Sequence, residues 1–130
     1  MTSLFLPFPP SVNGMFANRK GGRKKSDGYK MWLADAEEAY LKQRRHITPH
    51  TGKVQVIIML KAADNRRRDC DNLIKSVCDF LVNQKIIVAD DQRYVRSVMA
   101  MWNDSMSESG CFVVVEDFDG IKSANWGEVV

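Results

Sequence analysis

The chain has too few cysteines for a disulfide-rich protein or a typical zinc-binding domain. It contains only three cysteines, Cys70, Cys78 and Cys111, and no Cys-x-x-Cys pair. An odd number of cysteines without that spacing argues against a disulfide framework and matches no zinc signature. We therefore expect Cys78 and Cys111 to be small core residues.

Long hydrophobic runs are also missing. The longest apolar stretch, residues 54–60, is interrupted by Gln55 and is far shorter than the roughly 20 residues of a membrane-spanning helix. The first residues lack the positive start and the long apolar segment of a signal peptide. These features predict a cytoplasmic protein.

The composition is that of a folded globular protein. Of the 130 residues, 45% are hydrophobic and 27% are charged, and this length suits a single core. We expect one domain over residues 1–130, with its core at about 4–118 and a tail, 119–130, that shows no periodicity.

Positive charge is concentrated early in the chain. The net charge is only +3, but the last thirty residues carry one Lys or Arg against six Asp and Glu. The basic first hundred residues favour a polyanionic partner. Five of these cations fall within residues 18–25, which the two glycines predict to be a mobile surface loop. A surface loop without a function is the alternative.

Hydrophobic periodicity predicts an α+β domain, a mixed sheet with two main helices in the order β-α-β-α-β-β. We expect a helix capped by Ser26 or Asp27, and a second one capped by Asp71 or Asn72. The strand at 53–61 is apolar on both faces, which predicts a central position. The last two strands should pair as a hairpin around residues 103–110. The expected elements are strand 4–10, helix 29–45, strand 53–61, helix 71–82, strand 94–102 and strand 111–116.

Two carboxylates stand one residue apart after the arginine run 66–68. If the chain is still extended at Asp69 and Asp71, both side chains point the same way. Two hard oxygen ligands side by side form half of a magnesium or manganese site. Without a cation between them they would repel each other, so a positive partner is expected there.

Further polar residues could complete this site. Lys75 lies one helical turn after Asp71, where its ammonium could contact a phosphate, and Asn72 could orient a carboxylate. A helix followed by a short link could bring Asp90 and Asp91 back beside Asp69. The alternatives are that Asp71 or Asn72 is only a helix cap, that the 90–91 pair forms a turn, and that the arginines form a solvated face.

Four stretches of this sequence resemble one known family. They are, in chain order, Leu6-Pro7-Phe8-Pro9-Pro10-Ser11-Val12-Asn13, Arg67-Arg68-Asp69-Cys70-Asp71-Asn72-Leu73-Ile74-Lys75, Asp79-Phe80-Leu81 and Asp90-Asp91-Gln92. This arrangement is similar to motifs of the RusA family of Holliday junction resolvases. The resemblance covers roughly residues 4–118. The R-D-x-D-N-x-x-K block is its most specific part.

The resemblance implies a RusA-like fold and a homodimeric, Mg²⁺- or Mn²⁺-dependent endonuclease of DNA recombination and repair, acting in a bacterial cytoplasm as a phage or prophage product. It assigns catalytic roles to Asp69, Asp71, Asp91 and Lys75. It also implies that the three aspartates are metal ligands. The link before Asp90 is about one residue longer than the family pattern, so Asp90 is an alternative ligand.

The same resemblance implies that the basic residues bind the phosphate backbone of DNA. Phe16, Tyr29 and Trp32 are candidates for stacking on an unpaired base, with a core position as the alternative for Trp32. A nuclease for flaps or forks, and a non-catalytic DNA-binding accessory protein, are the rival functions. The candidate DNA-binding residues are Arg19, Lys20, Arg23, Lys24, Lys25, Arg66, Arg67 and Arg68.

Overall fold

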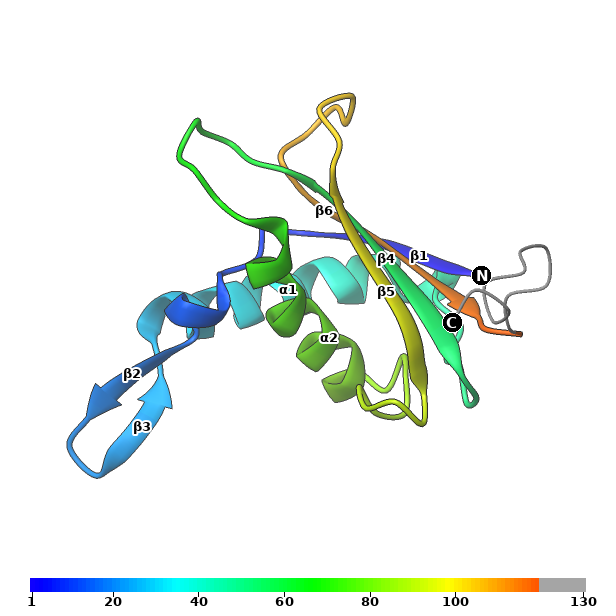
Figure 1. Cartoon of the computed structure of the whole chain (residues 1–130), viewed down its shortest axis with the longest axis horizontal. Coiled ribbons are helices and arrows are strands. Elements are labelled where there is room, and N and C mark those ends of the chain that lie inside the picture. Colours follow the sequence, from blue (N-terminus) through cyan, green and yellow to red (C-terminus); the bar gives the residue numbers. More distant parts are fainter. Residues whose placement is uncertain (120–130) are drawn as a thin grey trace, which may run out of the picture.

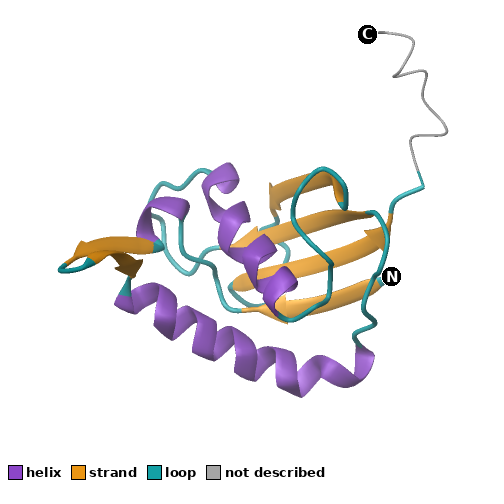
Figure 2. Ribbon diagram, turned by 90° about the horizontal axis from the view of Figure 1, so that it is seen from below, coloured by secondary structure: helices purple, strands orange, loops and turns teal. Residues whose placement is uncertain are grey.

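A four-stranded sheet and two long helices form the body of the protein, and a small two-stranded sheet extends from it (Figure 1). The computed structural model describes residues 1–119. Figure 2 shows α2 crossing in front of the larger sheet, with α1 beside it. This architecture confirms the α+β class. The elements are β1 (Thr2–Leu6), η1 (Val12–Gly14), β2 (Phe16–Arg19), β3 (Gly22–Lys25), α1 (Asp27–Gln43), η2 (Arg44–His46), β4 (Val54–Lys61), η3 (Cys70–Leu73), α2 (Ile74–Asn83), β5 (Val95–Trp102) and β6 (Gly110–Asp117).

The strand order in the larger sheet is β1-β6-β4-β5. The β4 strand pairs antiparallel with β6 and parallel with β5, so the sheet is mixed and β4 is central, as predicted. The expected hairpin between the last two strands is wrong, because β4 lies between them. Parallel neighbours need a long crossover connection, and α2 with its following link supplies it between β4 and β5.

One face of the sheet packs against both helices. Alternate β4 residues, Val54 to Leu60, are at most 1% exposed, as the two-residue period of a strand requires. Phe80 of α2 joins the two helices, since its ring lies edge-on to Trp32 of α1, with 5.7 Å between centroids. The core is therefore one continuous cluster shared by sheet and helices.

The α1 helix starts at a side-chain cap and ends over an exposed strand edge. Ser26 Oγ accepts the Tyr29 N–H at 3.1 Å, which satisfies a donor that the first helical turn leaves free. At the other end, the Gln43 side-chain amide bonds both backbone groups of Phe5 at 2.8 and 2.7 Å. Because β1 is an edge strand, this contact blocks pairing with another strand.

The structure corrects two further expectations. Residues 18–25 form most of the β2–β3 hairpin, because Gly21 and Gly22 adopt φ values of +90° and +117° that suit a tight turn. The sequence concealed this hairpin because its strands lack alternating apolar residues. The second helix starts with the 3-10 turn η3, whose N-cap is Asp69, so neither Asp71 nor Asn72 caps it.

No helix within the described residues is long and apolar enough to cross a membrane. The tail predicted at 119–130 lies outside the described residues except for its first position.

Candidate functional site

The two sequence motifs line one cleft. This cavity, of about 520 Å³, opens where β4 ends and the 62–69 loop turns back toward the segment that follows β1. We call it the motif cleft. Its walls come from the proline-rich segment, the arginine run and η3, and are formed by Phe8, Pro9, Pro10, Ser11, Asn13, Arg66, Arg67, Arg68, Asp69, Asn72 and Leu73.

Of the acidic pair, Asp69 lines the cleft and Asp71 does not, and the residue between them contacts β5. Asp69 has extended backbone angles, whereas Asp71 already lies in η3, so the strand-like alignment of the two side chains does not hold. Between them, the Cys70 thiol lies 3.7 Å from the Ala100 carbonyl oxygen. Both carboxylates are exposed, and neither one takes part in any hydrogen bond or ion pair found within residues 1–119.

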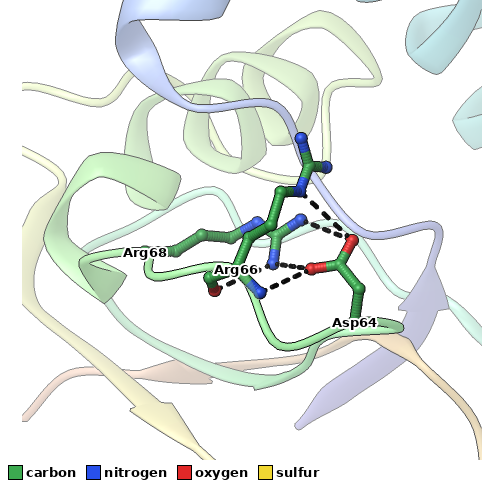
Figure 3. Close-up of polar contacts among 3 residues, drawn as sticks. All are labelled: Asp64, Arg66 and Arg68. Atoms are coloured by element: carbon green, nitrogen blue, oxygen red, sulfur yellow. Dashed lines mark hydrogen bonds and ion pairs between the residues drawn. The ribbon is translucent and has the colours of Figure 1, made fainter.

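The three arginines differ in their contacts. Arg68 donates two hydrogen bonds to the Asp64 carboxylate, at 2.7 and 3.1 Å, and Arg66 adds a backbone and a side-chain bond (Figure 3). These bonds hold the pKa of Asp64 well below its usual range. Among the described contacts, Arg67 has no hydrogen bond or ion pair, although it is exposed and lines the cleft.

Lys75 connects α2 to the link that follows it. Its ammonium lies 2.9 Å from Asp79 and 3.5 Å from Asp90. The hydrogen bond that Lys75 donates to Asp79 is the main cause of the raised pKa of Lys75. The link therefore returns to the first turn of α2, but it brings Asp90 to Lys75 and not to Asp69, beside which the sequence had placed it. Asp79 was not singled out as a site residue, although its spacing of four from Lys75 predicts this contact.

Asp91 is paired with a neighbouring cation. Its two carboxylate oxygens accept the Arg93 Nε and Nη2 at 3.0 and 2.8 Å, and the Arg93 backbone N–H at 2.9 Å. The side-chain hydrogen bond is the main reason that the pKa of Asp91 is lowered to about 2.

The structure therefore does not assemble the four candidate ligands in one place. Within residues 1–119, no group of three or more His, Cys, Asp or Glu side chains is placed to hold one metal ion. Asp69 lines the motif cleft, and Asp90 lines a separate cavity of about 200 Å³ together with Asp79 and Tyr29. The metal ligands stay a prediction.

The β2–β3 hairpin presents the second basic cluster. Its strands project away from the larger sheet (Figure 1), and residues 18–25 are all exposed. Two of its cations lie over aromatic rings, Arg23 over Phe16 at 5.2 Å and Lys25 over Tyr29 at 5.9 Å. The hairpin is thus a positively charged projection, and its residue Phe16 packs against Tyr29 of the core.

The aromatic candidates for base stacking are mostly buried. Tyr29 is 2% and Trp32 6% exposed, and their rings stack on each other. Both belong to the core, which excludes them as surface stacking residues. Phe16 is partly exposed but is in edge contact with Tyr29.

Comparison with known proteins matches this chain to one family. The family model described as Endodeoxyribonuclease RusA matches residues 7–116, a span that includes both motifs of the cleft. The chain is also 27% identical, over 97 residues, to a crossover junction endodeoxyribonuclease rusA of Enterobacteria phage HK97. That match covers 72% of this chain and 80% of the phage protein. The chain belongs to the RusA family of endodeoxyribonucleases.

Proposed function

We propose that this protein is a metal-dependent endodeoxyribonuclease that resolves four-way (Holliday) junctions in DNA recombination and repair. The observation that carries the proposal is the motif cleft, where the two family motifs meet and Asp69 lies beside the arginine run, with the exposed Asp71 two residues further along the chain. The name of the phage relative, a crossover junction endodeoxyribonuclease, supports the choice of substrate.

The donor chemistry of the acidic residues fits Mg²⁺ or Mn²⁺. Asp69 and Asp71 offer hard oxygen ligands, and within the described structure neither is engaged by a cation. Asp91, or Asp90 in its place, would complete the set by exchanging its present partner, Arg93 or Lys75, for the metal. When bound, such a metal activates water and stabilises the leaving oxygen of a phosphodiester.

The protein's own cations hold the substrate. Arg67 is the cleft arginine best placed to bind a backbone phosphate, because Arg66 and Arg68 are engaged by Asp64. Lys75 carries positive charge beside Asp90, where it can stabilise a phosphate that becomes more negative during cleavage. The basic hairpin adds contacts to the DNA backbone that position the substrate without reading its sequence.

A homodimer would supply the two symmetric cuts that resolution requires. The face of the larger sheet that points away from the helices suits a second copy of the chain, because it is apolar on all four strands and leaves Met99 53% exposed. Apolar surfaces of this kind mark protein interfaces. The apolar residues on this face are Phe5, Ile57, Met59, Met99, Met101, Phe112 and Val114, and the same face also carries Ser3, Gln55, Lys61, Ser97 and Glu116.

The test is a panel of labelled DNAs: a four-way junction, a fork, a flap and a linear duplex. With Mg²⁺ we expect paired, symmetric nicks in the junction, no cleavage in EDTA, and none by the Asp69→Asn variant. Faster cleavage of the flap or fork would assign the rival nuclease function. Binding without cleavage in any divalent cation would identify an accessory protein. Sedimentation equilibrium of the same sample measures the dimer.

A further inference from the structure

One aromatic ring lies in the wall of the motif cleft, and a second ring stacks on it. Neither ring has a role in the proposed function. Phe8 lines the cleft, and its ring stacks on Trp102, with centroids 6.1 Å apart and planes 16° from parallel. Trp102 is 40% exposed. We call these two rings the aromatic ledge. A tryptophan with so much of its surface in water is unusual, since apolar rings gain free energy from burial.

Each ring of the ledge is held by its own contacts. Trp102 ends β5, and the next residue, Asn103, donates its backbone N–H to Leu60 at the end of β4. The Arg68 guanidinium lies 5.2 Å from the centre of the Phe8 ring, while Asp64 holds that guanidinium with two hydrogen bonds. The ledge is therefore a rigid surface, which favours stacking because little freedom is lost on binding.

The ledge also lies beside the proposed reaction site. Cys70, between the two aspartates, contacts Ala100, and Ala100 is two residues before Trp102 on the same face of β5. The neighbouring Arg67 offers a cation for a backbone phosphate. An aromatic surface next to a phosphate-binding cation is the combination by which proteins bind single-stranded nucleic acid.

We propose that the aromatic ledge binds an unpaired nucleobase at the branch point of the DNA, with Trp102 as the stacking residue. This inference rests on the proposed function, because it takes the motif cleft as the DNA site. Inside a duplex, neighbouring bases cover both faces of every base. An unstacked base at a branch exposes a face that Trp102 can cover, so the ledge favours branched DNA over linear DNA.

The test measures binding in EDTA, so that it does not depend on cleavage. The DNA is a four-way junction that carries the fluorescent base 2-aminopurine at the branch point, and a linear duplex with the same probe is the reference. The variants are Trp102→Leu, which keeps an apolar contact with Phe8 but has no ring, Trp102→Phe, which keeps a ring, and Val98→Ala, an exposed position on the same strand and face. Circular dichroism checks the fold of each one.

We expect Trp102→Leu to bind the junction about tenfold more weakly than the wild type, with duplex binding unchanged. Its bound probe should be brighter, since no ring quenches it. Trp102→Phe and Val98→Ala should bind within about twofold of the wild type. The proposal would be overturned if Trp102→Leu bound the junction as tightly as the wild type, or if it lost affinity for the duplex to the same extent as for the junction. It would also be overturned if the bound probe were as bright with the wild type as with Trp102→Leu. These readouts stay valid if the chain cuts no DNA, so failure of the ledge and failure of the nuclease function are distinguishable.

Discussion

The Asp91 carboxylate is held by Arg93, two residues later in the chain, through three hydrogen bonds of 2.8–3.0 Å. This pairing keeps Asp91 ionised, with a pKa of about 2, and also occupies the oxygens that the proposed metal would bind. Arg93 and the proposed metal would therefore compete for one carboxylate, which the arginine holds in this structure.

Removing that competitor should make the metal bind more readily. We expect Arg93→Ala to lower the Mg²⁺ concentration for half-maximal cleavage by up to about fivefold, because an exposed ion pair is a weak competitor. The measurement is a Mg²⁺ titration of junction cleavage. Arg96→Ala is the matched control, since Arg96 contacts only the Gln92 carbonyl within the described residues. An unchanged titration for Arg93→Ala would argue that Asp91 is not a ligand.

Asp71→Asn should separate cleavage from binding. The change removes one negative ligand, so we expect cleavage to fall by more than about a hundredfold, the loss that even outer-shell partners of a metal can cause. Junction binding should stay or tighten, because one anionic charge beside phosphate is lost. Asp104→Asn, at an exposed position in the 103–109 loop, is the control. Undiminished cleavage by Asp71→Asn would eliminate the proposed metal site.

Arg67 and Arg68 should have different effects when each is replaced by alanine. We expect Arg67→Ala to weaken junction binding and to reduce the slope of log affinity against log salt by about one, with the melting temperature unchanged. Arg68→Ala removes the bonds to Asp64 and the contact with Phe8, so it should lower the melting temperature. Salt-dependent binding and thermal unfolding test both variants. The reverse pattern would contradict the assignment of Arg67 to phosphate.

The basic hairpin should contribute to DNA binding through charge alone. Lys20 and Lys24 are exposed, and within the described residues no carboxylate pairs with either one. Neutralising both should weaken binding to junction and duplex to a similar extent and reduce the salt slope by about two. Lys42→Ala, on the surface of α1 and paired with Glu38, is the control. A slope equal to that of the wild type would leave the hairpin without a role in DNA binding.

The buried thiols predict alkaline instability. Burial raises the pKa of Cys78 and of Cys111 to about 12, whereas a thiol in an unfolded chain ionises near 8.5. Between these values the unfolded chain binds fewer protons than the folded one, so the free energy of unfolding falls as pH rises, by about 1.4 kcal/mol per pH unit and thiol. Below pH 8 the thiols contribute no such dependence.

Urea unfolding at several pH values from 8 to 11 measures this effect. Cys78→Ala and Cys111→Ala should each remove about half of the thiol-dependent slope. Stability that stays constant with pH in the wild type would show that these thiols are accessible to solvent in the folded protein.

Local sequence signals predicted most of the elements. The apolar residues of β4 predicted a central strand, because both of its faces are covered to some extent. Ser26 predicted the start of α1, because a cap depends on side chains within one turn. The β2–β3 hairpin was missed because its strands are polar, although its two glycines were visible.

These local signals do not show which strands pair with one another in the sheet. Neighbouring strands with a short loop usually form a hairpin, and nothing local in β5 or β6 shows that β4 separates them. Likewise, the sequence indicated Asp69, Asp71, Asp90 and Asp91 as acidic candidates, but not that Arg93 and Lys75 would hold two of them.

The α+β class, the family and the residue types of the site can therefore be derived from the amino-acid sequence alone, because motifs and periodicity are local patterns along the chain. The strand order, the meeting of the two motifs in one cleft and the stacking of Phe8 on Trp102 emerge only in the folded protein. These contacts join residues tens of positions apart, and the free energy that selects them comes from packing the whole core.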